Sequence, residues 1–346
     1  MFVADAHLDL AYNVCRGRDI TRRAREQPVV GEREAETATV GLPDLRRGGV
    51  GLICATIFCQ PQTSDTAGYA DHEGALAQAR EQLDTYQRLW KEGQLRPVLE
   101  RAQLPSAAPP TGPTEGAIPM VLLIEGADAI SLASESNDAS AAAWHDAGAR
   151  MVGLAWGRTR YAGGTGAAGP LPAEGRRLVG ELDDAGFIHD ASHLAEESLD
   201  DLLALAARPI CASHSNCRAV VGHDPRGRHL DDRHIRAIAA RGGVIGVVLY
   251  DRFLLPPEEL AHRRATWADV VRHIDHMCQL TGGCGNFGIG SDLDGGFGRE
   301  HVPEELETIA DLPELAGALS DAGFADADIA RIMGGNWLEF FRRSLA

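Results

Sequence analysis

Residues 187–215, FIHDASHLAEESLDDLLALAARPICASHS, hold two short apolar runs with one helical segment between them. The runs at 187–191 and 209–213 have the length and composition of buried strands. A strand, a helix and a second strand in this order predict two adjacent parallel strands. Each run leads into a histidine, His193 and His214, so we expect the two rings side by side at one end of the sheet.

The same pattern extends over almost the whole chain. Apolar runs predict eight strands, at residues 1–5, 49–58, 119–124, 151–156, 187–191, 209–213, 243–249 and 286–291. Helical spacing lies between them at residues 71–90, 175–185, 194–207, 231–241 and 267–281. Eight βα units predict an α/β fold closed into a (β/α)₈ barrel of the TIM type, as one domain over residues 1–346. Extra C-terminal helices are expected near 303–322 and 326–343, with a turn at Gly334-Gly335.

Two irregular segments interrupt this order. Residues 102–118 are rich in Pro, Ala and Gly, and we expect a surface loop without a chemical role. Residues 157–169 hold five glycines with Arg158, Arg160 and Tyr161. This glycine-rich loop would leave the barrel at the same end as the histidines, where long loops commonly cover the substrate.

The composition excludes several classes of protein. A formal net charge of -17 and a pI near 5.2 disfavour nucleic acid and anionic membranes as partners, because both attract basic surfaces. No apolar segment approaches the roughly 20 residues of a membrane helix, and no cleavable leader precedes the first strand. The seven cysteines form no C-x-x-C pair, and Cys54, Cys59 and Cys211 lie in apolar runs. A cytoplasmic location is therefore expected.

Side chains that bind metals stand at the ends of the predicted strands. His7-Leu8-Asp9 places two of them on one side of an extended backbone, because residues i and i+2 share a face. Glu125 follows a run of apolar residues, so its carboxylate lies at the edge of the core, where metal coordination is one way to hold a charge. The alternatives are a hydrogen-bonded His-Asp pair and a salt bridge from Glu125 to an arginine.

His193, His214 and Asp292 extend this set. Asp292 closes the last strand in GSDLDGG (290–296), and Asp294 is the alternative to it. Each residue alone could be structural, but so many strand ends with ligand chemistry indicate a metal site. Other histidines lie in polar stretches or in a helix and are predicted to be solvated or locally hydrogen-bonded: His72, His145, His262, His273 and His276.

These motifs resemble those of the membrane dipeptidase (renal dipeptidase) family, a branch of the metal-dependent amidohydrolases with a (β/α)₈ barrel. They occur in family order over nearly the full chain, at His7-Leu8-Asp9, Ile124-Glu125-Gly126, Asp190-Ala191-Ser192-His193, Ser213-His214-Ser215-Asn216, residues 290–295 and Gly334-Gly335-Asn336. The H-x-D start makes the resemblance fairly specific, since most amidohydrolases begin with H-x-H.

The resemblance implies a dipeptidase with two zinc ions. Glu125 and a bridging hydroxide would join the ions, with His7 and Asp9 on one ion and His193 and His214 on the other. The hydroxide would be the nucleophile that attacks the peptide bond. His and carboxylate ligands would also accept manganese, iron or cobalt.

The resemblance also implies roles in catalysis and substrate binding. Asp292 would take a proton from the attacking hydroxide and pass it to the departing amine. An arginine after the second histidine would bind the substrate carboxylate. Arg228 fits the family's R-x-L-x-D spacing better, and Arg226 fits the preceding H-P-R pattern with one residue inserted.

The chain departs from the family at the fourth predicted strand. The dipeptidases carry a Leu-Thr-His run there, whose histidine helps bind the reacting carbonyl oxygen, whereas this chain has Leu154-Ala155-Trp156. The indole N–H can donate a hydrogen bond but does not polarise the carbonyl as histidine does. Either the substrate differs, or Arg158 or Arg160 substitutes, or Trp156 only packs against the barrel rim.

The sequence favours a metallohydrolase that cleaves small dipeptides with a free C-terminal carboxylate. One alternative is a hydrolase of the same superfamily that acts on another small amide or lactone. Another is a non-catalytic barrel that binds a ligand. Redox chemistry is disfavoured, because no G-x-G-x-x-G motif opens a strand-turn-helix unit. The expected partner is a small dipeptide-like molecule, and a homodimer is left open.

Overall fold

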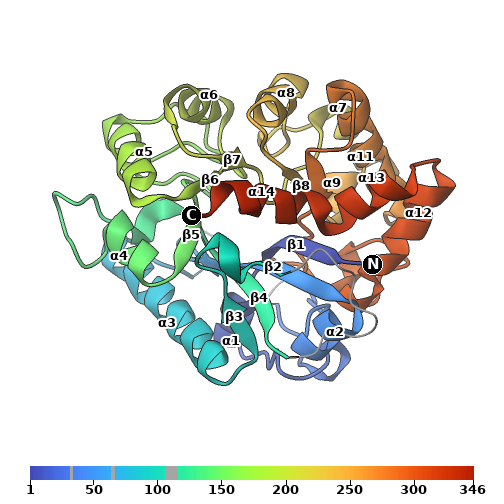
Figure 1. Cartoon of the computed structure of the whole chain (residues 1–346), viewed down its shortest axis with the longest axis horizontal. Helices are drawn as coiled ribbons and strands as arrows, with labels where there is room; N and C mark the ends of the chain where they lie inside the picture. The colour runs from blue at the N-terminus through green and yellow to red at the C-terminus, as the bar shows by residue number, and fades with distance from the viewer. Residues whose placement is uncertain (32–33, 64–66, 106–115) are drawn as a thin grey trace.

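The computed structural model describes residues 1–31, 34–63, 67–105 and 116–346. Its centre is a parallel sheet (Figure 1), with strands β1 (Val3–Leu8), β2 (Val50–Phe58), β3 (Leu95–Pro97), β4 (Ile118–Glu125), β5 (Ala149–Gly153), β6 (Ile188–Asp190), β7 (Ile210–Cys211), β8 (Ile245–Val247) and β9 (Phe287–Ile289). The strand order is β7-β6-β5-β4-β2-β1-β9-β8, and β3 pairs with β4 outside this path.

The two ends of this strand order meet. A parallel bridge joins Ala212, which follows β7, to Ile245 in β8. The Ala212 N–H donates to the Val244 carbonyl at 2.9 Å, and the Gly246 N–H donates to the Ala212 carbonyl at 2.8 Å. The sheet therefore curls into the (β/α)₈ barrel that the sequence predicts.

Helices surround the barrel in Figure 1. The longer helices are α3 (His72–Lys91), α5 (Ala173–Ala185), α6 (Glu196–Leu205), α8 (Asp232–Ala240), α11 (Trp267–Thr281) and α14 (Asn336–Ser344). The shorter ones are α1 (Leu10–Cys15), α2 (Leu42–Arg47), α4 (Ala141–Asp146), α7 (Arg218–Val221), α9 (Asp251–Leu254), α10 (Pro257–Leu260), α12 (Leu315–Asp321) and α13 (Asp326–Ala330). Short 3₁₀ helices lie at Ala24–Glu26, Arg101–Gln103, Ala127–Ala129, Arg299–His301 and Ile309–Glu314, and a π turn lies at Arg331–Gly335.

Local sequence explains where these helices begin and end. Helix α11 begins at a reciprocal cap, in which the Thr266 side chain accepts from the backbone of Asp269 and the Asp269 side chain accepts from the backbone of Thr266. It ends at Gly282, whose φ of 76° is in the left-handed region that glycine adopts without strain. Helix α3 begins at Asp71, whose side chain accepts from the Gly74 N–H.

The predicted elements agree with most of these bounds. All eight predicted strands and the five helices between them are present. Strand β3 was not predicted, because its three residues form no apolar run. The helix expected at 303–322 is present only from Leu315, as α12, and the expectation is wrong before that point, where Ile309–Glu314 forms a 3₁₀ turn that contains Pro313. Of the predicted loop at 102–118, residues 106–115 lie outside the described residues.

The helix expected at 326–343 is divided into α13, a π turn and α14. The division lies at Gly334, where a φ of 174° and a ψ of -20° interrupt the helix, so the predicted turn is confirmed. Trp337 and Phe341 of α14 pack with Phe2 and Val244, which directly precede β1 and β8. Helix α14 therefore closes the amino-terminal end of the barrel and leaves the carboxyl-terminal end for a site.

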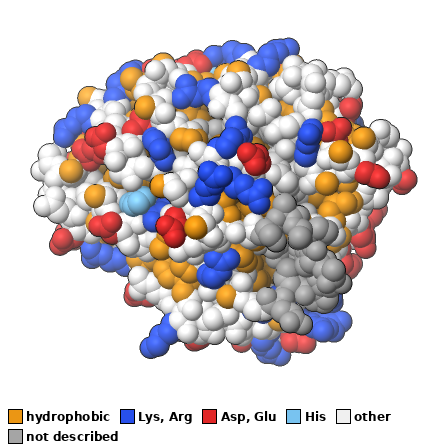
Figure 2. Space-filling view, in the orientation of Figure 1, with side chains coloured by type: hydrophobic (Ala, Val, Ile, Leu, Met, Phe, Trp, Pro, Cys, Tyr) orange, Lys and Arg blue, Asp and Glu red, His pale blue; other side chains and the backbone are white. Residues whose placement is uncertain are grey.

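Neither the cysteines nor the surface charges indicate where a functional site lies. The described cysteines are free thiols, and Cys54, Cys59 and Cys211 are buried as expected. Figure 2 shows acidic and basic side chains interspersed over the face on which α14 lies. In the described parts of the chain, no helix combines the length and hydropathy needed to cross a bilayer. The cytoplasmic location and the homodimer stay predictions.

Candidate metal centre

Six side chains from five barrel strands meet at the carboxyl-terminal ends of those strands. His7 lies within β1 and Glu125 is the last residue of β4, while the other four follow their strands: Asp9, His193, His214 and Asp292. All six are buried, with exposed fractions from 0 to 8%. The residues that the sequence singled out as ligands are therefore brought together.

Glu125 lies between the histidines. Its Oε1 is 3.2 Å from Nε2 of His193 and 3.5 Å from Nε2 of His214. Its Oε2 is 3.5 Å from Nε2 of His7, which also lies 4.0 Å from Oδ1 of Asp9. Each carboxylate oxygen of Glu125 therefore faces a different group of ligands.

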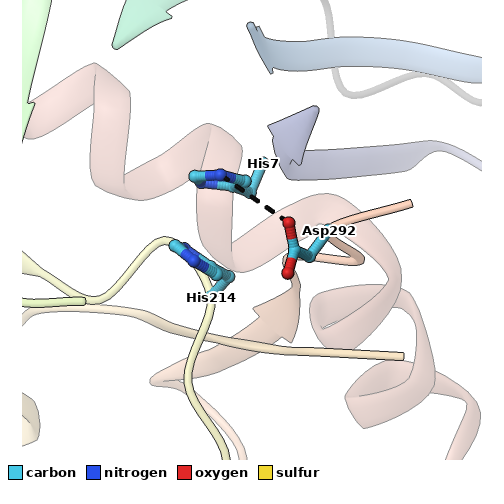
Figure 3. A group of neighbouring side chains, drawn as sticks. All are labelled: His7, His214 and Asp292. Atoms are coloured by element: carbon cyan, nitrogen blue, oxygen red, sulfur yellow. Dashed lines mark ion pairs between the residues drawn. The ribbon is translucent and has the colours of Figure 1, made fainter. Parts of the chain in front are cut away.

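Asp292 completes the centre on the side of His7 and His214. Figure 3 shows its carboxylate pointing toward the two rings, with Oδ1 3.9 Å from Nε2 of His7. The ring centroids of His7 and His214 lie 3.6 Å apart. In this group of His7, His214 and Asp292, one possible ligand atom from each residue lies within 4.8 Å of the others. Two further groups meet the same limit: Glu125 with His193 and His214, and His7 with Asp9 and Glu125.

The donor atoms fit divalent cations. Nε2 of His7 is buried and has no hydrogen-bond partner among the described residues. The Nε2 atoms of His193 and His214 lie 2.9 Å apart, a distance at which at most one of them can carry a proton. Imidazole nitrogens and carboxylate oxygens at such spacings are the ligands of zinc and similar ions. A cation among them would satisfy all these lone pairs at once.

The protein groups alone leave the centre rich in negative charge. Burial raises the pKa of Asp292 well above its usual range, and the charges of Asp9 and Glu125 act in the same direction. Burial and Glu125 together raise the pKa of Asp9 to about 6. Burial lowers the pKa of His7, but Glu125, Asp9 and Asp292 outweigh it and raise the pKa to about 10. Positive charge is thus favoured here.

The other two histidines differ from His7. Burial and the positive charge of Arg228 lower the pKa of His193 to about 4. Burial and His7 lower the pKa of His214 well below its usual value. Both rings are therefore neutral at pH 7, which is the form that binds metals.

Two of the candidate ligands have left-handed backbone. His193 has a φ of 66° and Asp292 a φ of 59°, a region that non-glycine residues seldom adopt. Each such residue costs on the order of 1 kcal/mol and is found most often at functional sites. The turns aim these side chains back over the barrel mouth.

Asp294, the alternative to Asp292, has a structural environment. Its carboxylate accepts from the Thr39 N–H and hydroxyl, both at 2.8 Å, and from the Val40 N–H at 3.0 Å. The buried guanidinium of Arg18 lies 2.8 Å from Oδ2, the oxygen that accepts from Val40. These contacts occupy the carboxylate, so Asp292 is the residue that faces the centre.

The two arginines considered for substrate binding differ in burial. Arg228 is 4% exposed, and it donates from Nη1 to the Ser215 hydroxyl at 3.1 Å and from Nη2 to the His214 carbonyl at 2.7 Å. Arg226 is exposed and lies beside Gly166 of the glycine-rich loop. Both line the cavity above the centre.

This cavity has a volume of about 210 Å³ and opens onto Asp9, Glu125, His193 and Asp292. Its walls are largely aromatic, formed by Tyr12, Phe58, Trp156, Tyr250, Phe253 and Phe297. Except for Trp156, the sequence singled out none of these aromatic residues, since a lone aromatic residue has no signal of its own. The cavity therefore combines charged groups at its base with apolar walls, as small-molecule sites do.

Trp156 faces the cavity rather than the outside of the barrel. Its ring centroid lies 5.5 Å from that of Phe58 and 6.0 Å from that of His193. Arg160 instead pairs with Glu135, and Arg158 donates to the Ala168 carbonyl at 2.6 Å. Neither arginine lines the cavity, so neither is placed to take over the role of the family histidine.

The glycine-rich loop reaches the centre through Thr165, which the sequence did not point to. Thr165 Oγ1 lies 2.9 Å from Nδ1 of His193 and also lines the cavity. Three of the histidines that were expected to be solvated or locally hydrogen-bonded, His72, His273 and His276, have hydrogen-bond partners away from the centre. His273, for example, lies 3.1 Å from both the Leu254 carbonyl and the Cys217 N–H.

Comparison with known proteins agrees with this geometry. A model of the membrane dipeptidase family (peptidase family M19) matches residues 1–344. A Klebsiella pneumoniae protein named "Uncharacterized protein in pqqA 5'region" is 30% identical over 232 residues, which are 64% of this chain and 81% of that protein. An uncharacterized dipeptidase of Schizosaccharomyces pombe is 31% identical over 172 residues, which are 50% of this chain and only 40% of that protein.

Solved structures share the architecture over the whole chain. A metallo peptidase from Rhodobacter sphaeroides, solved with a phosphinate mimic of the dipeptide L-Ala-D-Ala, is 25% identical, with a TM-score of 0.78 and 99% of each chain covered. The dipeptidase AC, a metallo peptidase of family M19, is 25% identical, with a TM-score of 0.79 and coverage of 100% of this chain and 99% of that one. By its sequence and its barrel, this chain belongs to the membrane dipeptidase family, peptidase family M19, a family of metallo-dipeptidases.

Proposed function

We propose that this protein hydrolyses the peptide bond of small dipeptides with the help of two zinc ions. The observation that carries the proposal is the position of Glu125, whose two oxygens face His7 on one side and His193 and His214 on the other. A carboxylate in this position can bridge two cations. His7 and Asp9 would hold one ion, and His193 and His214 the other.

When bound, the ions would supply an activated water as the nucleophile and would polarise the scissile carbonyl. Asp292 would move the proton. Its carboxyl is buried beside His7, and burial raises its pKa, which favours the protonated form. We infer that Asp292 accepts a proton from the attacking water and delivers it to the departing amine.

Arg228 would bind the C-terminal carboxylate of the substrate. Its guanidinium is held by Ser215 and by the His214 carbonyl, so the positive charge is fixed beside the centre. Its Nε is buried without a hydrogen-bond partner among the described residues. A fixed cation loses little freedom when it binds an anion. Arg226, at the exposed rim, would contribute a weaker attraction.

A second candidate function keeps the centre and changes the substrate. Trp156 stands where the resemblance expects a histidine, and it joins an aromatic wall with Phe58. Such a wall favours a substrate with an apolar group next to the reacting amide or lactone. The Trp156→Phe variant separates the two roles of the indole. A fall in kcat would assign the N–H to the reacting carbonyl, and an unchanged kcat would assign only the ring.

Turnover by the zinc-loaded protein tests the proposal. The panel would contain small dipeptides with L and D C-terminal residues, the matching dipeptide amides, and simple lactones. Hydrolysis of free-carboxylate dipeptides, lost after chelation and restored by zinc, is the expected result. Activity on amides or lactones without any dipeptide turnover would replace the dipeptidase proposal with the second candidate.

A further inference from the structure

The hydroxyl of Ser213 lies at the centre of a buried cluster behind the proposed metal ligands. Its Oγ is 2.5 Å from Oδ2 of Asp190, 2.8 Å from Nδ1 of His214 and 3.0 Å from Nδ1 of His7. The Ser192 hydroxyl is farther away, at 3.3 Å. Ser213 is fully buried, so these protein groups are its surroundings.

Counting protons fixes the direction of each hydrogen bond. A serine hydroxyl has one proton to donate and two lone pairs that accept. An ionised carboxylate only accepts, so the proton of Ser213 goes to Asp190, in the shortest of these contacts. The two lone pairs then accept from the Nδ1–H groups of His7 and His214.

This arrangement determines where the ring lone pairs point. A neutral imidazole with its proton on Nδ1 has its lone pair on Nε2. Nε2 of His7 lies 3.5 Å from Oε2 of Glu125, and Nε2 of His214 lies 3.5 Å from Oε1 of the same residue. The lone pair of His214, and that of His7 once a cation takes the place of its second proton, would therefore face the carboxylate that would bridge the ions.

We propose that Asp190 and Ser213 are positioning residues that set the tautomer of one histidine on each of the two ions. A single proton, donated from Ser213 to Asp190, would prepare both halves of the centre at once. Partners of this kind orient metal-binding histidines and are worth about 10- to 100-fold in metal affinity. The inference rests on the metal centre of the proposed function.

The barrel contains a matched control for this pair. Asp190 Oδ1 accepts from the Ser213 N–H at 2.8 Å and the Ser192 N–H at 3.0 Å, and Oδ2 accepts from the Ser213 hydroxyl. Asp5 Oδ1 likewise accepts from the Ser291 N–H at 2.9 Å and the His7 N–H at 3.2 Å.

The second pair differs from the first in its second backbone donor, which is His7 instead of Ser192, and in the contacts of its serine hydroxyl. Asp5 Oδ2 accepts from the Ser291 hydroxyl at 2.5 Å, the same distance as in the Asp190 pair. Ser291 contacts no histidine ring nitrogen within the described chain, whereas Ser213 contacts two. A loss of zinc affinity that occurs only when the Asp190 pair is altered can therefore be assigned to the rings of His7 and His214. The burial of an Asp-Ser pair would not explain it, because Asp5 and Ser291 form such a pair as well.

The test compares Asp190→Asn with Asp5→Asn. Asparagine keeps one oxygen for the backbone bonds but turns an NH₂ group toward the serine. Ser213 must then accept from the amide and direct its own proton to a ring Nδ1, which moves that ring's proton to Nε2. Zinc affinity, measured by competition with a chromophoric chelator, should fall about 10- to 100-fold for Asp190→Asn and by less than about 3-fold for Asp5→Asn.

Two substitutions of the serine keep the test decisive if Asp190→Asn does not fold. Ser213→Ala removes one atom and should weaken zinc binding to a similar extent. Ser213→Thr keeps the hydroxyl and should restore binding toward the value of the unaltered protein. Circular dichroism shows whether each variant is folded.

Nitrogen-15 NMR gives a readout that a purely structural role would not change. The group observed is the His214 ring in the zinc-free protein. Its spectrum should show a proton on Nδ1 in the unaltered protein and in Asp5→Asn, and a changed tautomer or a mixture in Ser213→Ala.

Equal zinc affinities for Asp190→Asn, Ser213→Ala and Asp5→Asn would overturn this inference alone. A His214 proton found on Nε2 in the unaltered protein would do the same. A complete failure of the unaltered protein to bind zinc would remove the proposed function, and this inference with it.

Discussion

The Nε2 atoms of His193 and His214 lie 2.9 Å apart because the two histidines occupy equivalent positions on neighbouring strands. In the register of β6 and β7, Asp190 pairs with Cys211, and each histidine lies three residues beyond its member of that pair. The spacing of 21 residues between the histidines is therefore the length of one βα unit. Convergence of these ligands follows directly from the barrel topology.

Replacement of Asp292 by asparagine should abolish turnover without removing the metal. The carboxyl faces the centre from β9, but in the proposal it moves a proton rather than holding an ion. Loss of a general acid-base group typically costs about 10²- to 10⁴-fold in rate. The zinc content and kcat of Asp292→Asn test this. Loss of zinc in parallel with activity would make Asp292 a ligand instead, and unchanged kcat would reject the proton-transfer role.

Substitution of Arg228 should affect substrates according to their C-terminal charge. Arg228→Gln removes a buried positive charge that the proposal places on the substrate carboxylate, so kcat/KM should fall by about 10²-fold or more for a dipeptide. The corresponding dipeptide amide should lose much less. Arg226→Gln is the matched variant at the exposed rim, and its kcat/KM should change less than about 5-fold. Equal losses for the dipeptide and its amide would show that Arg228 acts only through its bonds to Ser215 and His214.

The sequence predicts the barrel and the six residues at its mouth for the same reason. An apolar run predicts a buried strand, and a histidine or carboxylate at its end predicts a candidate ligand. The run that ends at Glu125 is an example of both. The aromatic wall carries no such signal. Tyr250 and Phe297 stack with their ring centroids 4.3 Å apart, although they are 47 positions apart in the chain and each stands among ordinary neighbours.

Short elements and hydrogen-bond clusters also could not be predicted from the sequence. Strand β3 has one buried residue, Leu95, and forms only because β4 offers it an edge. Ser213 stands in the motif Ser213-His214, but its contact with His7 joins residues 206 positions apart. Such contacts depend on the folded arrangement of several strands and leave no local pattern.

His273 should make the protein less stable in mild acid. Burial lowers its pKa to about 3, and as a neutral ring it accepts from the Cys217 N–H and donates to the Leu254 carbonyl. Because the pKa is lower in the folded state than the unfolded value of 6.5, the stability from this group is present above pH 6.5 and is lost as the pH falls toward 3.

Because His273 binds a single proton, its contribution to the pH dependence of the free energy of unfolding has an upper limit. Between pH 6.5 and pH 5 the free energy of unfolding should fall by about 2 kcal/mol from this group, at about 1.4 kcal/mol per pH unit. Urea unfolding of the zinc-free protein at pH 7 and pH 5 measures it. His273→Gln should reduce the difference between the two pH values, and the exposed His262→Gln should leave it unchanged. The same pH difference in all three proteins would exclude His273 as its source.

Gly288 in β9 should not tolerate even a methyl group. A Cβ there would lie 2.5 Å from Nε1 of Trp337, whose indole is fully buried and donates to the Ile289 carbonyl at 3.0 Å. The indole must then move and lose its hydrogen bond, so Gly288→Ala should destabilise the protein by about 1–3 kcal/mol in urea unfolding. Gly285→Ala, where a Cβ meets no atom within 4 Å, should stay within about 0.5 kcal/mol of the unaltered protein. Because Trp337 closes the end of the barrel opposite the metal centre, folded Gly288→Ala should bind zinc normally, and reduced zinc affinity would show that the two ends are coupled.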